Sequence, residues 1–142
     1  MEARIGGRPV QKRPAEKNMA HTIRKVGVIG AGQMGNGIAH VCALAGLDVV
    51  LNDTSQDRVK AAIATVNGNM ARQVTRNRIA EEERQAALQR ISAAEKLDAL
   101  SDCDLVIEAA TEKEDVKRKI LAALCPVLKP DAIKLITAAV QP

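Results

Sequence analysis

Apolar residues in this chain occur in two patterns, as short uninterrupted runs and as positions that recur every three or four residues. Uninterrupted runs are typical of strands buried on both faces of a parallel sheet, and the spaced pattern is typical of amphipathic helices. The runs predict strands over residues 23–30, 47–52, 91–94, 105–110 and 132–137. The spaced positions predict helices over 33–45, 81–90 and 113–124, a helical turn over 98–102, and a long helix that begins after Ser55 and includes Val59 to Val74.

Strands and helices alternate along the chain, with two helices between the second and third strands. This order predicts an α/β fold of the Rossmann-like, doubly wound type, with a mostly parallel sheet and an inserted helical hairpin. We assign residues 22–142 to this one domain. Residues 1–21 mix glycine, proline and charge without periodicity, and predict a disordered extension; a transit peptide is the alternative.

Composition narrows the possible partners. The net charge is +4, but residues 1–20 hold five basic and two acidic side chains, so that the remainder carries only +1. Aromatic residues, which stack on bases, are absent from the whole sequence, and we therefore expect no nucleic-acid binding. No apolar run is long enough to span a membrane, and a cytoplasmic protein is the default expectation.

The three cysteines have no metal-ligand spacing, and we expect no metal site. Cys42 and Cys125 fall on apolar helix faces, where a free cysteine behaves as a small hydrophobic residue. We therefore expect both to be reduced and buried.

The first predicted strand ends in a glycine-rich segment that opens the first helix. Gly30 allows a sharp turn, Gly32 lets the backbone approach a pyrophosphate, and Gly35 lets the helix pack closely on the strand. Asp53, at the end of the second strand, can accept both ribose hydroxyls and repels a 2′-phosphate, which favours NAD over NADP. The alternative is a glycine turn without a ligand. The predicted cofactor-binding segment consists of Gly30, Ala31, Gly32, Gln33, Met34 and Gly35.

Residues 26–39, Asp53, the helical hairpin and the segment Leu-Val-Ile-Glu-Ala-Ala-Thr-Glu at 105–112 resemble the NAD-binding domain of 3-hydroxyacyl-CoA dehydrogenases. The bacterial 3-hydroxybutyryl-CoA dehydrogenases are the most similar group, and the resemblance extends over residues 22–133. It implies hydride transfer between a 3-hydroxyacyl-CoA, such as 3-hydroxybutyryl-CoA, and NAD in fatty-acid and butanoate metabolism. Oxidation of 3-hydroxybutyryl-CoA gives acetoacetyl-CoA.

The resemblance also implies roles for individual residues. Glu112 and Lys117 match residues beside the nicotinamide ribose and the substrate, although charged residues are also ordinary at a helix start. Asn69 and Arg76 stand near the hairpin positions that contact CoA, whose phosphates suit the arginine fork. The alternative for this second pair is a solvated helix face.

After residue 133 the chain departs from the family. The family's Asn-Thr-Ser-Ser turn, its catalytic histidine and the helical domain that forms the homodimer have no counterpart in this sequence, which has only His21 and His40. We therefore expect that a shifted reading frame or a truncated gene produced this ending. We also expect that the chain has no catalytic residue and does not turn over substrate alone. A stand-alone nucleotide-binding module and a remnant that cannot fold stably are the alternatives.

Overall fold

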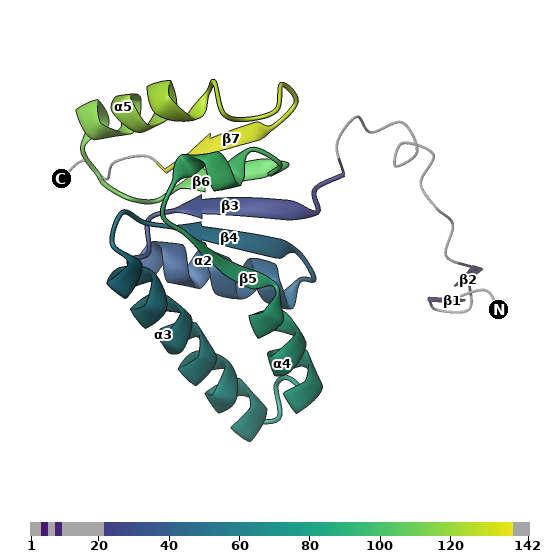
Figure 1. The fold of residues 1–142 in the computed structure, drawn as a ribbon. Helices are drawn as coiled ribbons and strands as arrows, with labels where there is room; N and C mark the ends of the chain where they lie inside the picture. The colour runs from purple at the N-terminus through teal and green to yellow at the C-terminus, as the bar shows by residue number, and fades with distance from the viewer. Residues whose placement is uncertain (1–3, 6–7, 10–21, 138–142) are drawn as a thin grey trace.

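A single parallel sheet forms the centre of the molecule. The structure, a computed structural model, describes residues 4–5, 8–9 and 22–137. Five strands pair in the order β5-β4-β3-β6-β7, so that the chain winds from β3 first to one side of the sheet and then to the other (Figure 1). The strands are β3 (Lys25–Ile29), β4 (Asp48–Asn52), β5 (Ile91–Ala94), β6 (Leu105–Glu108) and β7 (Ile133–Ile136). The doubly wound topology predicted from the sequence is confirmed.

Helices cover both faces of this sheet. The helical elements are α2 (Gln33–Leu44), α3 (Gln56–Thr75), α4 (Glu81–Gln89), the short 3₁₀ helix η1 (Leu97–Leu100) and α5 (Glu114–Leu124). Because side chains of a strand alternate between its faces, Val26 and Val28 of β3 pack with α2, α3 and α4, whereas Ile29 packs with η1 and α5. The fold therefore has two aliphatic cores, one on each side of the sheet.

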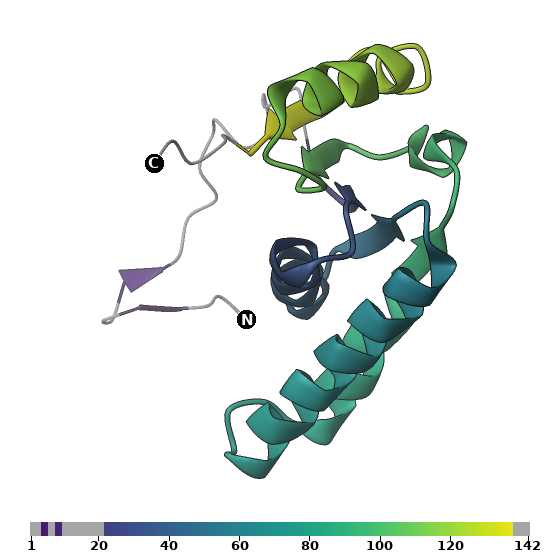
Figure 2. The same ribbon diagram turned by 90° about the vertical axis from the view of Figure 1, so that its left-hand side faces the viewer.

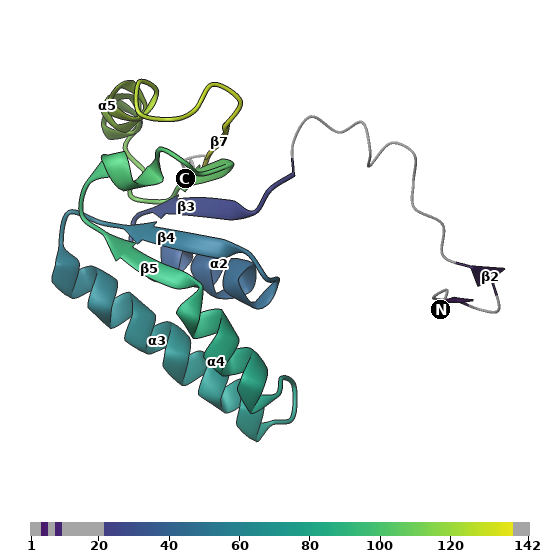
Figure 3. The ribbon, with the colours of Figure 1, turned by 45° about the vertical axis from the view of Figure 1, so that its right-hand side comes forward.

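The predicted helical hairpin is confirmed as α3 and α4, which lie side by side and extend away from the strands (Figure 2 and Figure 3). The hydroxyl of Ser55 accepts a hydrogen bond from the backbone N–H of Arg58 at 3.3 Å and caps α3. The apolar face of α3 is buried against the sheet and α4 through Val59, Ala62, Val66 and Met70.

The buried face of α2 is made of small residues, and the prediction that Cys42 and Cys125 are both buried is wrong. Helix α2 lies so close to β3 that only small residues fit between them, and its buried positions are Gly35, Ala39 and Ala43; the side chain of Val41 is 68% exposed. Cys125, the C-cap residue of α5, is exposed, and Cys42 of α2 is only partly buried. Burial raises the pKa of the Cys42 thiol.

Some strand ends are shorter than predicted. Strand β3 begins at Lys25 because the backbone N–H groups of Arg24 and Lys25 both donate to the carboxylate of Asp104. Strand β6 ends at Glu108, whose carboxylate accepts the N–H of Ala110 at 2.7 Å and turns the chain out of the sheet.

The predicted extension over residues 1–21 lies outside the described residues, except for β1 (Arg4–Ile5) and β2 (Arg8–Pro9), which pair antiparallel. The end of the sequence after residue 137 also lies outside them. Among the helices that the structure describes, none has the length and apolarity needed to cross a lipid bilayer.

Candidate functional site

The glycine segment forms a tight turn between β3 and α2. Gly30 has a φ of +108°, and its N–H donates to the carbonyl oxygen of Asn52 at 2.7 Å. A Cβ at Gly30 would lie 2.6 Å from the Cα of Ala110, so that both the backbone conformation and the close contact require glycine. The turn therefore brings β3, β4 and the end of β6 together.

Gly32 and Gly35 serve different purposes in this turn. A Cβ at Gly35 would lie 1.7 Å from the carbonyl oxygen of Gly30, and glycine is thus required for α2 to start directly on the turn. A Cβ at Gly32 would meet only the guanidinium of Arg58, at 3.5 Å. Internal packing therefore does not explain Gly32, whereas an external group that approaches the backbone does.

The N-terminus of α2 is open to such a group. Gly32 is its N-cap residue and supplies no side-chain cap, so that backbone N–H groups of the first turn are available to an anion. A cavity of about 330 Å³ adjoins the turn and is lined in part by Gly32, Asn36 and Arg58. The side-chain oxygen of Asn36 is buried without a hydrogen-bond partner among the described residues. The free backbone N–H groups and the Arg58 guanidinium fit a bound pyrophosphate, whereas the Asn36 oxygen accepts hydrogen bonds and is not one of its donors.

A second cavity, of about 350 Å³, lies on the other side of the turn between the ends of β3, β4 and α5. Its polar lining includes Asp53, Arg58 and Glu95, and its apolar lining includes Leu97, Val116 and Ile120. An apolar slot with a carboxylate at its mouth fits an adenosine, with the base in the slot and the ribose at the carboxylate.

The carboxylate of Asp53 is held by the backbone on both sides. Its Oδ2 accepts the N–H of Ala31 and its Oδ1 accepts the N–H of Ser55, each at 3.0 Å, and the side chain is 10% exposed. Burial alone raises the pKa of Asp53, but these two hydrogen bonds and the positive charge of Arg58 outweigh it, so that the pKa lies below its usual value. Asp53 is therefore ionised at neutral pH and retains lone pairs for ribose hydroxyls.

A buried ion pair lies next to the turn, at the carboxyl end of β6. Lys117 Nζ donates to Glu108 Oε2 at 2.6 Å, and these side chains are 7% and 1% exposed. Lys117 also donates to the hydroxyl of Thr137 at 3.2 Å, which in turn donates to the carbonyl oxygen of Glu108 at 2.9 Å. Because β3 and β6 run side by side and lead to opposite sides of the sheet, this pair stands at the topological switch point, where such folds bind ligands.

The structure brings some of the predicted site residues together. The segment from Gly30 to Gly35 meets Asp53 through the Ala31 hydrogen bond, and Lys117 lies at the same edge of the sheet. Glu112 is exposed in the connection before α5. Arg76, the C-cap residue of α3, lies 18 residues after Arg58, about 27 Å along the helix axis, and is exposed.

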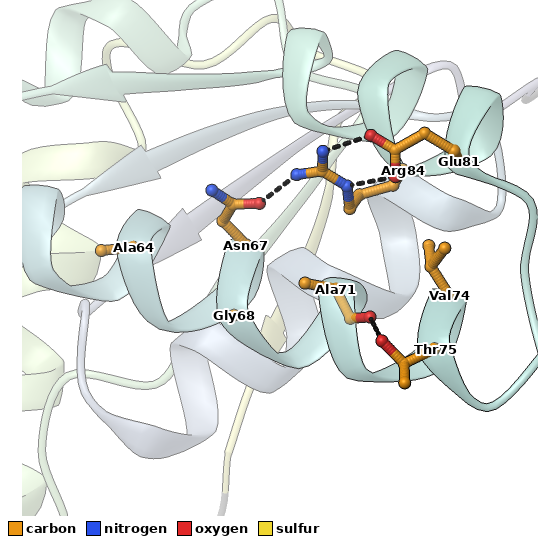
Figure 4. Close-up of a pocket in the computed structure, with 8 residues that line it drawn as sticks. All are labelled: Ala64, Asn67, Gly68, Ala71, Val74, Thr75, Glu81 and Arg84. Atoms are coloured by element: carbon orange, nitrogen blue, oxygen red, sulfur yellow. Dashed lines mark hydrogen bonds and ion pairs between the residues drawn. The ribbon is translucent and has the colours of Figure 1, made fainter.

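The hairpin has a cavity of its own, of about 470 Å³. Arg84 crosses it, donating to Glu81 and to the side-chain oxygen of Asn67, the latter at 2.6 Å (Figure 4). Neither of the predicted CoA-binding residues lines this cavity; Asn69 instead accepts a hydrogen bond from Arg72. The roles predicted for all the site residues, including Asn69, Arg76 and Glu112, stay predictions.

Two residues that the sequence analysis did not single out belong to the site. Glu108 is a charged residue at the end of a buried strand, and this position could have identified it as a candidate site residue. Arg58 follows the N-cap Ser55 by three residues and lines both cavities beside the glycine turn. No motif marked Arg58, because its place depends on how α3 lies against the turn.

Comparisons with known proteins agree with this geometry. Residues 25–139 match the family model described as the NAD binding domain of 3-hydroxyacyl-CoA dehydrogenase. The expectation that the chain departs from the family after residue 133 is therefore wrong for residues 134–139, which lie within the match. A 3-hydroxybutyryl-CoA dehydrogenase of Bradyrhizobium diazoefficiens is 70% identical over 115 residues, which cover 81% of this chain and 39% of that protein.

Two solved structures have the same fold. The (S)-3-hydroxybutyryl-CoA dehydrogenase PaaH1 of Ralstonia eutropha superposes with a TM-score of 0.78 at 41% identity, over 81% of this chain and 41% of that one. FadB2 of M. tuberculosis superposes with a TM-score of 0.81 at 38% identity, over 86% and 43%. The chain thus spans about two fifths of the length of these proteins. With its glycine turn and this match, the chain belongs to the 3-hydroxyacyl-CoA dehydrogenase family and carries that family's NAD-binding domain.

Proposed function

We propose that this chain supplies the NAD-binding part of a 3-hydroxybutyryl-CoA dehydrogenase, an enzyme that transfers hydride between a 3-hydroxyacyl-CoA and NAD. The observation that carries the proposal is the open space at Gly32, where no protein atom except the Arg58 guanidinium would meet a side chain. The names of the similar proteins support the substrate class. A cytoplasmic location and a homodimer stay predictions from the sequence.

Different residues of the proposed site bind different parts of the cofactor. Bound NAD supplies the ring carbon that accepts hydride. The first N–H groups of α2 hold the pyrophosphate, and the Asp53 carboxylate accepts the adenosine ribose hydroxyls. The slot beside Leu97 and Ile120 excludes water from the adenine.

Lys117 and Glu112 form the other end of the proposed site. An ammonium group has three donors, and Lys117 uses two of them on Glu108 and Thr137. The third has no partner within residues 22–137, and we propose that it contacts the nicotinamide ribose or the substrate. Glu112, in the exposed connection before α5, is proposed as its neighbour at the ribose.

The hairpin is proposed as the contact for CoA, through Asn69 and Arg76. Asn69 lies on α3 and Arg76 at its C-terminal cap, beyond the nucleotide crevice, where the long CoA arm can reach. A guanidinium can bind two phosphate oxygens at once. Replacing Arg76 by alanine should weaken binding of CoA and leave NADH binding unchanged, which calorimetry with each ligand can measure.

Oxidation of a hydroxyl also needs a base for its proton. His40, the histidine among the described residues, lies on α2, and its Nε2 is 2.8 Å from the side-chain oxygen of Gln73 on α3. It is not at the crevice. We therefore expect the 142-residue chain to bind NADH without turning over acetoacetyl-CoA.

A titration with NADH tests this proposal. Because the sequence lacks tryptophan and tyrosine, the emission of NADH itself reports binding without interference from the protein. Gly32→Val should fold normally, since Gly32 has an extended backbone conformation and room for a side chain, but should weaken NADH binding at least about 10-fold by blocking the pyrophosphate.

Gly37→Ala is the matched control for this titration. A Cβ at Gly37 meets nothing within 4 Å, and the change should leave NADH affinity as it is. Equal NADH binding by Gly32→Val and the unaltered chain would contradict the proposed cradle. Turnover of acetoacetyl-CoA by the purified chain would contradict the expectation of binding without catalysis.

A further inference from the structure

The buried pair of Glu108 and Lys117 is part of a longer series of contacts that begins at the glycine turn. The two oxygens of the Glu108 carboxylate have different partners: Oε1 accepts the N–H of Ala110 at 2.7 Å, and Oε2 accepts Lys117 Nζ at 2.6 Å. Ala110 packs directly on the turn, because a Cβ at Gly30 would lie 2.6 Å from its Cα. One carboxylate therefore connects the Lys117 ammonium to the backbone that packs on the glycine turn.

The hydroxyl of Thr137 holds the ammonium from a second side. A hydroxyl has one hydrogen, and that of Thr137 is donated to the carbonyl oxygen of Glu108 at 2.9 Å. Only its lone pairs are then left for Lys117 Nζ, at 3.2 Å, so that the hydroxyl accepts from the ammonium. The backbone N–H of Thr137 donates to the same carbonyl oxygen at 3.2 Å, and the hydroxyl is thus held in place by β6.

Two acceptors on one ammonium fix the direction of its third N–H. A lysine side chain is a flexible four-carbon stem with three rotatable donors, and a single acceptor leaves the other two donors able to turn about that one bond. Because Glu108 and Thr137 each accept one N–H of Lys117, that rotation is blocked. A donor that is already fixed loses less freedom when a ligand binds, and the contact is correspondingly stronger.

We propose that Thr137 is a positioning residue, which together with Glu108 directs the third donor of Lys117 at the nicotinamide half of the cofactor. Glu108 balances the charge of the lysine, and Thr137 sets its orientation. Neither residue needs to touch the cofactor itself. This inference rests on the contact to the nicotinamide ribose that is proposed above for Lys117, and it extends that contact to the residues that hold the lysine.

The experiment uses the full chain and two ligands, NADH and ADP, since ADP lacks the nicotinamide and its ribose. NADH binding is followed by its own emission and ADP binding by calorimetry. Thr137→Val keeps the branched shape of the side chain and removes the hydroxyl. It should weaken NADH binding about 5-fold and leave ADP binding within about 2-fold, because only the nicotinamide half depends on Lys117. Thr137→Ser restores the hydroxyl and should return NADH affinity to within about 2-fold of the unaltered chain.

A second measurement asks whether Thr137 acts through Lys117. Glu108→Gln with Lys117→Met removes both charges of the pair, so that neither is left buried without a partner. Adding Thr137→Val to this double variant should change NADH affinity by less than about 2-fold, because the lysine through which the hydroxyl acts is gone. A further loss as large as the one that Thr137→Val causes in the unaltered chain would overturn the proposal.

Thr75→Val is the matched control, because it removes a hydroxyl from a distant part of the chain. Thr75 lies near the end of α3, where its hydroxyl donates to the carbonyl oxygen of Ala71 at 3.1 Å, and the change should leave both affinities as they are. If Thr137→Val unfolds, Thr137→Ala removes the same hydroxyl with a smaller side chain. Equal losses of NADH and ADP affinity in a folded Thr137 variant would mean a merely structural role and would overturn the proposal.

Three results separate this inference from the proposed function. If the double variant of Glu108 and Lys117 binds NADH as tightly as the unaltered chain, the role proposed for Lys117 fails, and the positioning role fails with it. If the double variant loses NADH affinity and Thr137→Val does not, Thr137 is not a positioning residue and the proposed function stands. If the unaltered chain binds no NADH, the proposed function itself fails.

Discussion

The two halves of the sheet's carboxyl edge are built in different ways. On the β3–β4 side the site consists mainly of backbone: a glycine turn, the N–H groups of α2 and one short acidic side chain. On the β6–β7 side it consists of long side chains, with Lys117 from α5 reaching Glu108 at the end of β6. Strand β7 is at the edge of the sheet, where Ile133 and Leu135 are 41% and 53% exposed.

The difference shows which parts of a nucleotide site a local sequence can specify. A backbone turn depends on a few adjacent residues and on the strand and helix beside it, so that one short segment determines its shape. A buried ion pair needs two distant segments in register and the exclusion of water around both charges. Substitutions on the β3–β4 side should therefore destabilise the fold through steric collision. Substitutions on the β6–β7 side should destabilise it by leaving a buried charge unpaired.

The largest effect is expected at Gly35, on the backbone side. Gly35→Ala places a Cβ 1.7 Å from the carbonyl oxygen of Gly30, so that α2 has to move away from β3. We expect a loss of about 4 kcal/mol in the free energy of unfolding, measured by urea denaturation followed by circular dichroism. Gly37→Ala, two residues along the same helix and in open space, should instead stabilise by about 0.5–1 kcal/mol. Similar stabilities for the two variants would contradict the close packing.

A smaller effect is expected from the buried pair on the other side. Lys117→Met leaves the carboxylate of Glu108, which is 1% exposed, without its cation and should cost about 3 kcal/mol in the same denaturation experiment. The double variant Glu108→Gln with Lys117→Met removes both charges, and the amide oxygen that replaces the carboxylate can still accept the N–H of Ala110. The double variant should therefore be more stable than Lys117→Met alone, and a less stable one would mean that the pair is not the reason for the loss.

The smallest effect concerns Asp104, which joins the two halves at the opposite edge of the sheet. The ammonium of Lys129 and the backbone N–H groups of Arg24 and Lys25 hold the pKa of Asp104 at about 2. Because this pKa is below its unfolded value of about 3.9, the stabilisation is complete above pH 4 and is lost as the pH falls from 4 to 2.

Asp104→Asn should remove that pH dependence. Since Asp104 and Lys129 are 19% and 35% exposed and solvent screens their attraction, the loss at pH 7 should be about 1 kcal/mol. Denaturation curves at pH 7 and pH 3 should therefore differ less for Asp104→Asn than for the unaltered chain. Asp102, also near Lys25, has a lowered pKa through its bond to that lysine, and Asp102→Asn serves as a second, more exposed comparison.

Much of the fold was predictable because the apolar runs are long enough to identify strands and the spaced positions identify helices. Strand β5 over Ile91–Ala94 and the start of α4 at Glu81 occur where they were predicted. Which face of α2 is buried was not predictable in the same way. The alanines Ala39 and Ala43 are no more apolar than Val41, so that the sequence pattern does not single out their face. Their burial follows from the small distance between α2 and β3, which Gly35 permits.

The sequence by itself determined the glycine turn, the acid at the end of β4 and the family, because each depends on residues that are adjacent or on two consecutive strands. Only the tertiary structure decided that Glu108 and Lys117 pair in the core and that Arg58 faces both cavities. Those contacts join residues of different elements, and their positions depend on how α3 and α5 pack on the sheet. The sequence does not show whether a charged side chain is solvated or paired with another charge. The packing of the elements around it determines which of the two occurs.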